Sequence, residues 1–235
     1  MVPRLRLELE PGDALRAVCA EAADSPWILT RGADGVAELR DARAPRQRPL
    51  RIELAGAEVR RRIAQGRRGL LPRALGFRKP PWRVLDLTAG LGRDAATCAG
   101  LGMEVLAHER QPLLAALLAE AAERDAPQLR GALRIRAGSA GPAEWSSVDA
   151  VLYDPMYPTA AHGAAPSLEL QRLRELVGED ADVAATFAAL RAQPPARLAV
   201  KRPPRGARVE LAPPDVAFDG GRVRWAVYLR PPEAH

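Results

Sequence analysis

A short apolar run of the chain ends in a glycine-rich turn, Asp86–Asp94, that could hold a cofactor. Gly90 and Gly92 lack a Cβ atom, so the backbone can turn tightly there and a ligand can lie directly against it. The residues after the turn are expected to start a helix, whose free N–H groups and positive dipole end suit an anion. That anion could be a phosphate or the carboxylate of an amino-acid ligand.

Two cofactor classes compete for this turn. The string Gly90–Ala95 fits the G-x-G-x-x-A dinucleotide fingerprint, which is a weak signal by itself. Asp86 and Asp94 flank the glycines, and both carboxylates would oppose a pyrophosphate. S-adenosylmethionine (SAM) carries an ammonium, a carboxylate and a cationic sulfonium, so its charges suit these residues better. We therefore favour SAM and keep a nicotinamide-dependent oxidoreductase as an alternative.

The ends of the next two predicted strands indicate a nucleoside ligand. The second strand ends in His108-Glu109-Arg110, and an acidic residue there can accept hydrogen bonds from both ribose hydroxyls. The third ends in Gly138-Ser139-Ala140, where a short side chain could border an adenine. Dinucleotide-binding and SAM-binding folds share the ribose carboxylate, so Glu109 does not choose between them.

The fourth predicted strand ends in Asp154-Pro155-Met156-Tyr157, which resembles the (Asn/Asp)-Pro-Pro-(Tyr/Phe) signature of methyltransferases that act on exocyclic or amide nitrogens. The aryl amine of a base is a poor nucleophile because its lone pair spreads into the ring. Asp154 and a backbone carbonyl held by Pro155 can hydrogen-bond the amine protons and localise that lone pair. Tyr157 can stack on the extruded base, which is worth about 1–3 kcal/mol. We therefore predict catalytic roles for Asp154, Pro155 and Tyr157.

Strands and helices alternate from residue 82 onward, which predicts an α/β fold with a mostly parallel, Rossmann-like sheet covered by helices on both faces. The predicted strands are 84–87, 104–107, 133–136, 148–153 and 198–200, with a closing antiparallel pair at 209–211 and 223–229. The predicted helices are 94–100, 112–122, 167–177 and 182–192. Each motif falls at the carboxyl end of a strand, where ligands bind in such sheets.

Residues 1–56 are predicted to form a small α+β subdomain. Leu5, Leu7 and Leu9 alternate with charged residues as in a strand, and a turn at 32–35 predicts a hairpin. The predicted elements are a helix at 14–23, hairpin strands at 27–30 and 36–39, and a further strand at 50–54. A basic connector, 57–80, then leads to the cofactor-binding domain, 81–235.

The connector is strongly basic. Between Arg60 and Lys79 it has eight basic residues and no acidic one, whereas ordinary helix faces mix both signs. This run favours phosphate contact over a merely solvated face. The residues that we expect to bind RNA there are Arg60, Arg61, Arg62, Arg67 and Arg68. Lys201 and Arg202, at the end of the fifth strand, would either bind RNA or pair with local carboxylates.

The composition of the 235-residue chain agrees with a basic globular protein. Its net charge of +6 favours a polyanionic partner such as a nucleic acid. The only two cysteines lie far apart and no Cys/His cluster occurs, so we predict neither a disulfide nor a metal site. No signal peptide and no apolar run of about 18–20 residues is evident, so we expect a cytoplasmic protein without a membrane span. Lys79 and Lys201 are its only lysines.

Taken together, the motifs resemble the RsmJ family of bacterial small-subunit (16S) rRNA guanine-N2 methyltransferases. The match runs in order over about residues 55–205 and rests on Asp86–Asp94, His108–Arg110, Tyr153–Pro158, Leu176–Gly178 and Val200–Pro203. One departure is the segment 159–167, which has no lysine or arginine where the family usually has a lysine-rich segment.

The resemblance implies a class I methyltransferase fold with SAM as cofactor and small-subunit rRNA, or the ribosomal subunit, as partner. It implies cofactor contacts from Arg93, Asp94, Glu109, Arg110, Ser139, Ala140 and Asp154, beside those expected above for Asp86, Gly90 and Gly92. The leading hypothesis is methylation of a guanine N2 amine in 16S rRNA. The alternatives are the same fold acting on another RNA or DNA base or a protein amide, and an RNA-binding module without turnover.

Overall fold

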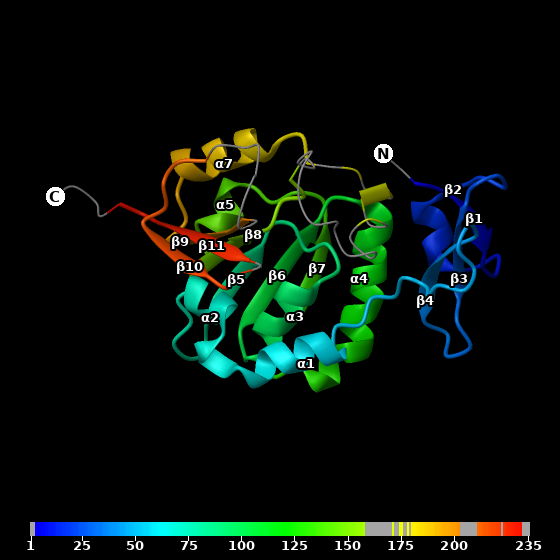
Figure 1. Cartoon of the computed structure of the whole chain (residues 1–235), viewed down its shortest axis with the longest axis horizontal. Coiled ribbons are helices and arrows are strands. Elements are labelled where there is room, and N and C mark those ends of the chain that lie inside the picture. The colour runs from blue at the N-terminus through cyan, green and yellow to red at the C-terminus, as the bar shows by residue number, and fades with distance from the viewer. Residues whose placement is uncertain are drawn as a thin grey trace.

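The protein is built around a seven-stranded sheet with the order β10-β11-β9-β8-β5-β6-β7 (Figure 1). This computed structural model describes residues 3–157, 171, 174–175, 178, 180–202, 211–221 and 223–231. The strands are β5 (Arg83–Asp86), β6 (Glu104–Glu109), β7 (Leu133–Ala137), β8 (Ala150–Tyr153), β9 (Arg197–Arg202), β10 (Val216–Asp219) and β11 (Arg224–Leu229). Strands β5 to β9 run parallel to one another, and β11 pairs antiparallel with β9 and β10. The predicted α/β fold class is confirmed.

Helices cover both faces of this sheet, because successive side chains of a strand point to opposite sides. In β5, Val84 faces the hydrophobic cluster of one side and Leu85 that of the other. The first side carries α1 (Ala57–Ala64), α2 (Leu70–Ala74), α3 (Arg93–Gly100) and α4 (Pro112–Asp125). The second carries α5 (Pro142–Trp145) and α7 (Val183–Ala192), seen above the sheet in Figure 1.

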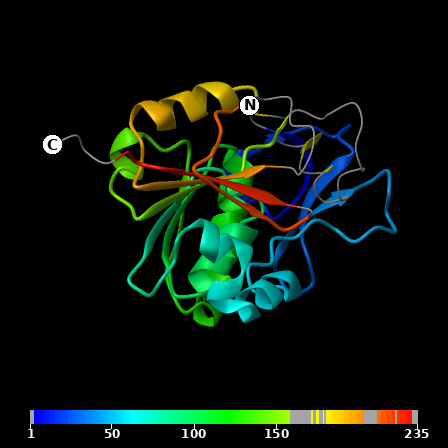
Figure 2. The ribbon, with the colours of Figure 1, turned by 60° about the vertical axis from the view of Figure 1, so that its left-hand side comes forward.

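The N-terminal residues form a second, four-stranded sheet with the order β2-β1-β3-β4, drawn in blue in Figure 2. Its strands are β1 (Arg4–Glu8), β2 (Ala20–Glu21), β3 (Trp27–Arg31) and β4 (Ala37–Asp41). The predicted hairpin is confirmed, with Gly35 in its turn at φ 77°. The predicted helix at 14–23 is wrong in extent: a 3-10 helix capped by Asp13 covers only Ala14–Val18, and β2 follows. The predicted strand at 50–54 is reduced to one bridge, between Leu39 and Leu50.

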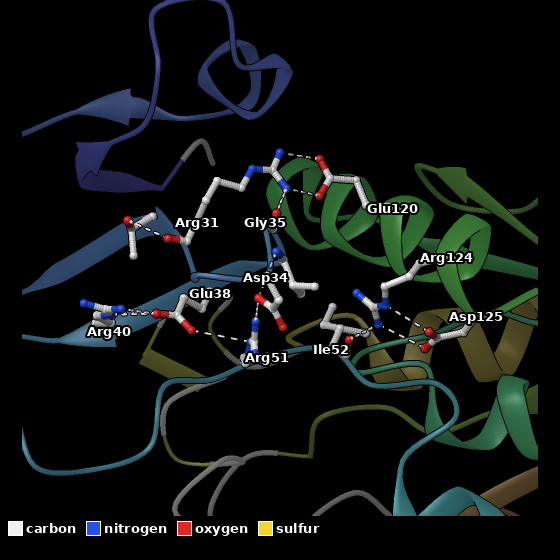
Figure 3. A network of polar contacts seen from close by, with 12 residues as sticks. Arg31, Asp34, Gly35, Glu38, Arg40, Arg51, Ile52, Glu120, Arg124 and Asp125 are labelled. Atoms are coloured by element: carbon white, nitrogen blue, oxygen red, sulfur yellow. Dashed lines mark hydrogen bonds and ion pairs between the residues drawn. The ribbon is translucent and has the colours of Figure 1, made fainter.

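Polar contacts fasten this small sheet to α4 (Figure 3). Arg31 in β3 donates to both carboxylate oxygens of Glu120 in α4, at 2.6 and 2.8 Å. At the end of α4, the buried Asp125 carboxylate accepts the backbone N–H groups of Leu54 (2.8 Å) and Ala55 (3.2 Å). These contacts and a shared hydrophobic cluster join the N-terminal residues to the larger sheet. The boundaries that we drew at 56 and 80 stay a prediction.

The closing strand pair differs from the prediction. β11 matches the predicted strand at 223–229, but its partner is Val216–Asp219 and not 209–211. Leu211 is not in a strand, and residues 209–210 lie outside the described residues. Pro213 and Pro214 explain the shift, since proline lacks the N–H that a sheet requires. The predicted helix at 167–177 falls largely outside the described residues.

The described residues contain neither a membrane-spanning helix nor a cluster of metal ligands. Among them, no helix is both long and apolar enough to cross a membrane. Nor do three or more His, Cys, Asp or Glu side chains of this part of the chain come together to hold a metal ion.

Candidate active site

A cavity of about 230 Å³ opens at the carboxyl ends of β5, β6 and β8. Six of the ten residues that we expected around a cofactor line it: Gly90, Glu109, Arg110, Ser139, Ala140 and Asp154. Lining residues that the sequence did not indicate include Thr88, Gln111, Met156, Asp180, Asp182 and Thr186. The motifs that are spread over the sequence therefore meet at one edge of the sheet, as parallel strands require.

The Glu109 carboxylate is held in place by the backbone of two turns. Oε2 accepts the N–H of Gly90 at 3.0 Å, and Oε1 accepts the N–H of Gln111 at 2.9 Å. Burial raises the pKa of Glu109, although both N–H groups oppose that shift. The Gln111 side chain caps α4 by accepting the N–H of Leu114 at 2.8 Å. The glycine turn and the start of α4 are thus fixed around one carboxylate that faces the cavity.

Four residues of the expected cofactor set lie behind the cavity wall and not on it: Asp86, Gly92, Arg93 and Asp94. The Asp86 carboxyl is 1% exposed and accepts the N–H of Thr88 at 3.0 Å, and burial raises its pKa well above the usual range. Arg93 pairs with Glu58 of α1 at 3.3 Å. This group supports the glycine turn from behind, and its contact with the cofactor stays a prediction.

The loop after β7 is tied to β6 through His108. Its Nδ1 lies 3.2 Å from the Gly138 carbonyl oxygen, and its Nε2 lies 3.1 Å from Oε1 of Glu144. Glu144 also accepts the N–H of Gly141 at 3.1 Å. The ring therefore fixes both ends of the short loop that presents Ser139 and Ala140 to the cavity.

Asp154 connects the cavity with a buried group of charges. Its N–H donates to Oγ1 of Thr88 at 2.8 Å, which joins the substrate motif to the glycine turn. Lys201 donates from Nζ to Oδ2 of Asp154 at 2.7 Å and to Oδ2 of Asp94 at 2.9 Å. Arg62 of α1 completes the group by pairing with the other oxygen of Asp94.

The residues that we expected to bind RNA differ in their exposure and in their partners. Arg60, Arg61, Arg67 and Arg68 are exposed. Arg62 points inward to Asp94, with a side chain 22% exposed, which corrects its place in the surface run. Lys201 pairs with carboxylates, the second of the two outcomes that we expected, and Arg202 is hydrogen-bonded to the Tyr228 side chain.

Asp180 is a site residue that sequence reasoning missed. Its Oδ2 accepts the N–H of Met156 at 2.6 Å, and its own N–H donates to the Met156 carbonyl at 3.0 Å. Its other oxygen pairs with Arg110. Asp180 therefore links the substrate motif to the end of β6, from a segment without any recognisable motif.

Tyr157 lies deeper than we expected. It is 7% exposed and belongs to the hydrophobic cluster beneath α7, and the described residues give its hydroxyl no hydrogen-bond partner. The chain turns back there because the Tyr157 N–H donates to the Pro155 carbonyl at 3.0 Å. This position differs from the open stacking surface that we predicted, so base stacking by Tyr157 stays a prediction.

Comparison with known proteins identifies the family. The family model described as "Putative SAM-dependent methyltransferase" matches residues 16–230. Relatives named ribosomal RNA small subunit methyltransferase J, from Pseudomonas paraeruginosa and Coxiella burnetii, are 36% and 35% identical over 77% and 84% of this chain and 74% and 81% of their own length. A third, from Pseudomonas aeruginosa, is 32% identical over 96% of this chain and 95% of its own. The chain belongs to the ribosomal RNA small subunit methyltransferase J family.

Family membership confirms the resemblance read from the motifs, and it makes the chain a SAM-dependent methyltransferase. A solved SAM-dependent methyltransferase from Neisseria gonorrhoeae has the same fold, with a TM-score of 0.66, 23% identity, and coverage of 96% of this chain and 95% of that one. In this member of the methyltransferase J family, the glycine turn, the acidic end of β6 and the Asp-Pro motif lie around one cavity.

The residues of the cavity fit SAM. Glu109, held by two backbone N–H groups, offers the cavity a fixed carboxylate that could accept hydrogen bonds from ribose hydroxyls, and Ser139 and Ala140 border the neighbouring part of the wall. Asp154 and Met156 lie on the side of the substrate motif. A bound nucleoside can therefore lie along the glycine turn with its reactive end towards Asp154, which is the arrangement that methyl transfer needs.

Proposed function

We propose that this methyltransferase acts on the exocyclic N2 amine of a guanine in small-subunit (16S) rRNA. The observation that carries the proposal is Asp154, whose carboxylate lines the same cavity as Glu109 and follows β8 in an Asp-Pro motif. The names of its relatives supply the class of RNA. The ribosomal subunit, in the cytoplasm, is the partner that we propose for it.

The proposed mechanism is one of positioning. SAM, when bound, supplies a methyl group on a cationic sulfonium. Asp154 accepts one proton of the substrate amine in a hydrogen bond and localises the nitrogen lone pair towards that methyl group. The Pro155 carbonyl is fixed by the Tyr157 N–H, and its second lone pair is available for the other amine proton. Aligning the reacting atoms in this way accounts for much of the expected acceleration.

The cofactor contacts that we propose come from the cavity wall. Glu109 binds the ribose hydroxyls, the backbone at Gly90 lies against the ligand, and Ser139 and Ala140 border the adenine. Asp86, Gly92, Arg93 and Asp94 lie behind this wall, and their direct contact with SAM stays a prediction. Arg110 is already paired with Asp180 and Asp182 at the rim of the cavity, so we propose that it closes the cavity on the ligand side of α4.

Nucleoside mass spectrometry of 16S rRNA tests the proposed function. RNA from cells that lack the gene is expected to lose one N2-methylguanosine, and a plasmid copy of the wild-type gene is expected to restore it. A copy encoding Asp154→Ala should not restore it. An unchanged content of N2-methylguanosine in the deletion strain would contradict the proposal.

The same experiment tests the second candidate, which is methylation of another base. The observation that favours it is the absence of lysine and arginine from 159–167, next to the Asp-Pro motif. In that case a different methylated nucleoside would disappear from the deletion strain while N2-methylguanosine persisted.

The exposed arginines of the connector are expected to bind the RNA backbone. Changing Arg60, Arg61, Arg67 and Arg68 together to glutamine should weaken RNA binding and make it less dependent on salt. Each lost phosphate contact reduces the slope of log K against log salt by about 0.7–0.9, so four contacts give a change of about 3. Fluorescence anisotropy with a 16S rRNA fragment at several salt concentrations measures this slope.

Arg130 and Arg134 provide the matched control for this surface. Both are exposed, and they lie beside and within the outer strand β7. Changing them to glutamine lowers the net charge by two and is expected to leave the slope nearly unchanged. If both sets of variants reduced the slope of log K against log salt by the same amount for each charge removed, the connector would act only through the net charge of the protein.

A further inference from the structure

Lys201 is the less exposed of the two lysines, and it lies beside Asp154 at the reactive end of the cavity. It belongs to β9, and its side chain is 26% exposed. Its ammonium reaches two carboxylates from different elements, Asp154 after β8 at 2.7 Å and Asp94 in α3 at 2.9 Å. The ring of Trp225, its partner in β11, lies below it with 5.7 Å from Nζ to the ring centroid.

Three carboxyl groups and two cations meet at this place. Asp86 from β5, Asp94 and Asp154 supply the carboxyl groups, and Arg62 from α1 is the second cation. Burial raises the pKa of Asp86 well above its usual range. Asp94 and Asp154 pair directly with the cations. An unpaired charge would be costly at such a site, so removing Lys201 must change the state of its neighbours.

Asp154 depends most directly on these charges. Burial raises the pKa of the Asp154 carboxyl, Asp94 adds to that shift, and the Lys201 ammonium opposes it. Burial lowers the pKa of Lys201, but Asp154 and Asp94 outweigh burial and raise it, so its amine stays charged. Lys201 therefore favours the ionised form of Asp154 and also fixes the position of one of its oxygens.

We propose that Lys201 is a positioning residue for methyl transfer: by binding Oδ2 of Asp154, it holds the ionised carboxylate with Oδ1 directed to the substrate amine. The inference rests on the proposed function, because Asp154 must be the group that meets the amine. A phosphate contact is a poorer explanation of Lys201, since its ammonium already pairs with two carboxylates. Asp94 of α3 accepts a hydrogen bond from Lys201, and Arg62 of α1 in turn pairs with Asp94.

Steady-state kinetics of Lys201→Met, compared with wild type, tests this role. We expect kcat at neutral pH to fall by about 100-fold, as for a misplaced reacting group, with a small change in the Kd for SAM. The acidic limb of the kcat–pH profile should move to higher pH by about 1–3 units, since the cation that favours ionised Asp154 is lost. Lys201→Arg should recover part of kcat and the original limb.

Arg134→Met removes an exposed cation of β7 and should leave both kcat and the profile unchanged. A wild-type acidic limb and kcat in Lys201→Met would overturn the inference. That result differs from a failure of the proposed function, in which the wild-type protein itself would not methylate 16S rRNA.

A second measurement covers the case in which Lys201→Met does not fold. Because the chain has only two lysines, the full-length protein labelled with ¹³Cε-lysine gives one lysine signal besides that of Lys201. Lys79→Arg assigns the pair. We expect the Lys201 signal to remain that of a charged amine to about pH 11 and to shift in Asp154→Asn, while the Lys79 signal does not shift. A Lys201 signal that is unaffected by Asp154→Asn would also overturn the inference.

Discussion

Replacing Asp154 by alanine is expected to abolish methyl transfer while the protein keeps its fold. The variant removes the carboxylate of the Asp-Pro motif that is proposed to accept an amine proton, so the nitrogen lone pair is no longer directed at the methyl group. Loss of one such positioned group costs about 10²–10⁴ in rate. Single-turnover transfer of a labelled methyl group to a 16S rRNA fragment measures the rate, and calorimetry measures SAM binding.

Asp154→Asn sharpens this test. The amide oxygen of asparagine still accepts a hydrogen bond, and the neutral amide does not need the Lys201 ammonium beside it. This variant should therefore keep more activity than Asp154→Ala. Its activity should also lose the dependence on acid pH that an ionising carboxyl gives. Asp219→Ala changes an exposed carboxylate in β10 and serves as the control, with wild-type rate. Equal, wild-type rates in all three variants would remove Asp154 from the mechanism.

The sequence predicts the sheet and the place of the site because both depend on local patterns. Short apolar runs gave β5, β6, β8 and β9, since a strand buried on both faces is short and mostly apolar. The glycine turn and the Asp-Pro motif were then placed at strand ends, and parallel strands bring such ends to one edge. The sequence could therefore place Glu109, Ser139 and Asp154 around one cavity without any knowledge of tertiary contacts.

The remaining part of the site depends on contacts between residues far apart in the chain. Lys201 meets Asp154 across 47 residues and Asp94 across 107, and no motif records either pairing. Arg62 is one of three consecutive arginines, and only the packing of α1 on α3 selects it to turn inward. Asp180 has no signal at all, because its role is to bond the backbone at Met156.

The glycine turn is a second case in which the sequence does not predict the tertiary contacts. The spacing of Gly90 and Gly92 indicates that both need a conformation without a Cβ, and both have positive φ, 57° and 73°. The spacing does not indicate which of the two glycines faces the ligand. A Cβ on Gly90 would meet only the Thr88 carbonyl oxygen, at 3.9 Å, whereas one on Gly92 would lie 2.6 Å from both Leu54 and Leu118. Gly90 thus faces the cavity, and Gly92 faces the core.

This difference predicts that alanine at Gly92 mainly destabilises the fold, whereas alanine at Gly90 mainly weakens SAM binding. Gly92→Ala should lower the free energy of unfolding by about 2–5 kcal/mol, from positive-φ strain of about 1–2 and overpacking of about 1–3 kcal/mol. Gly90→Ala should lower it by only the strain, about 1–2 kcal/mol, but should weaken SAM binding. Urea unfolding gives the stabilities, through a shift of the midpoint at constant m, and calorimetry gives the affinities.

The pair also tests how the N-terminal residues are joined to the cofactor turn. Leu54 belongs to the segment that Asp125 holds at the end of α4, so a methyl group on Gly92 presses on the attachment of the small sheet. Truncating the obstructing side chain by Leu54→Ala should therefore recover part of the stability lost in Gly92→Ala, although Leu54→Ala alone is destabilising by about 2–5 kcal/mol. Strictly additive losses in the double variant would show that Leu54 does not press on the substituted turn, so that the loss in Gly92→Ala would come from backbone strain and from Leu118.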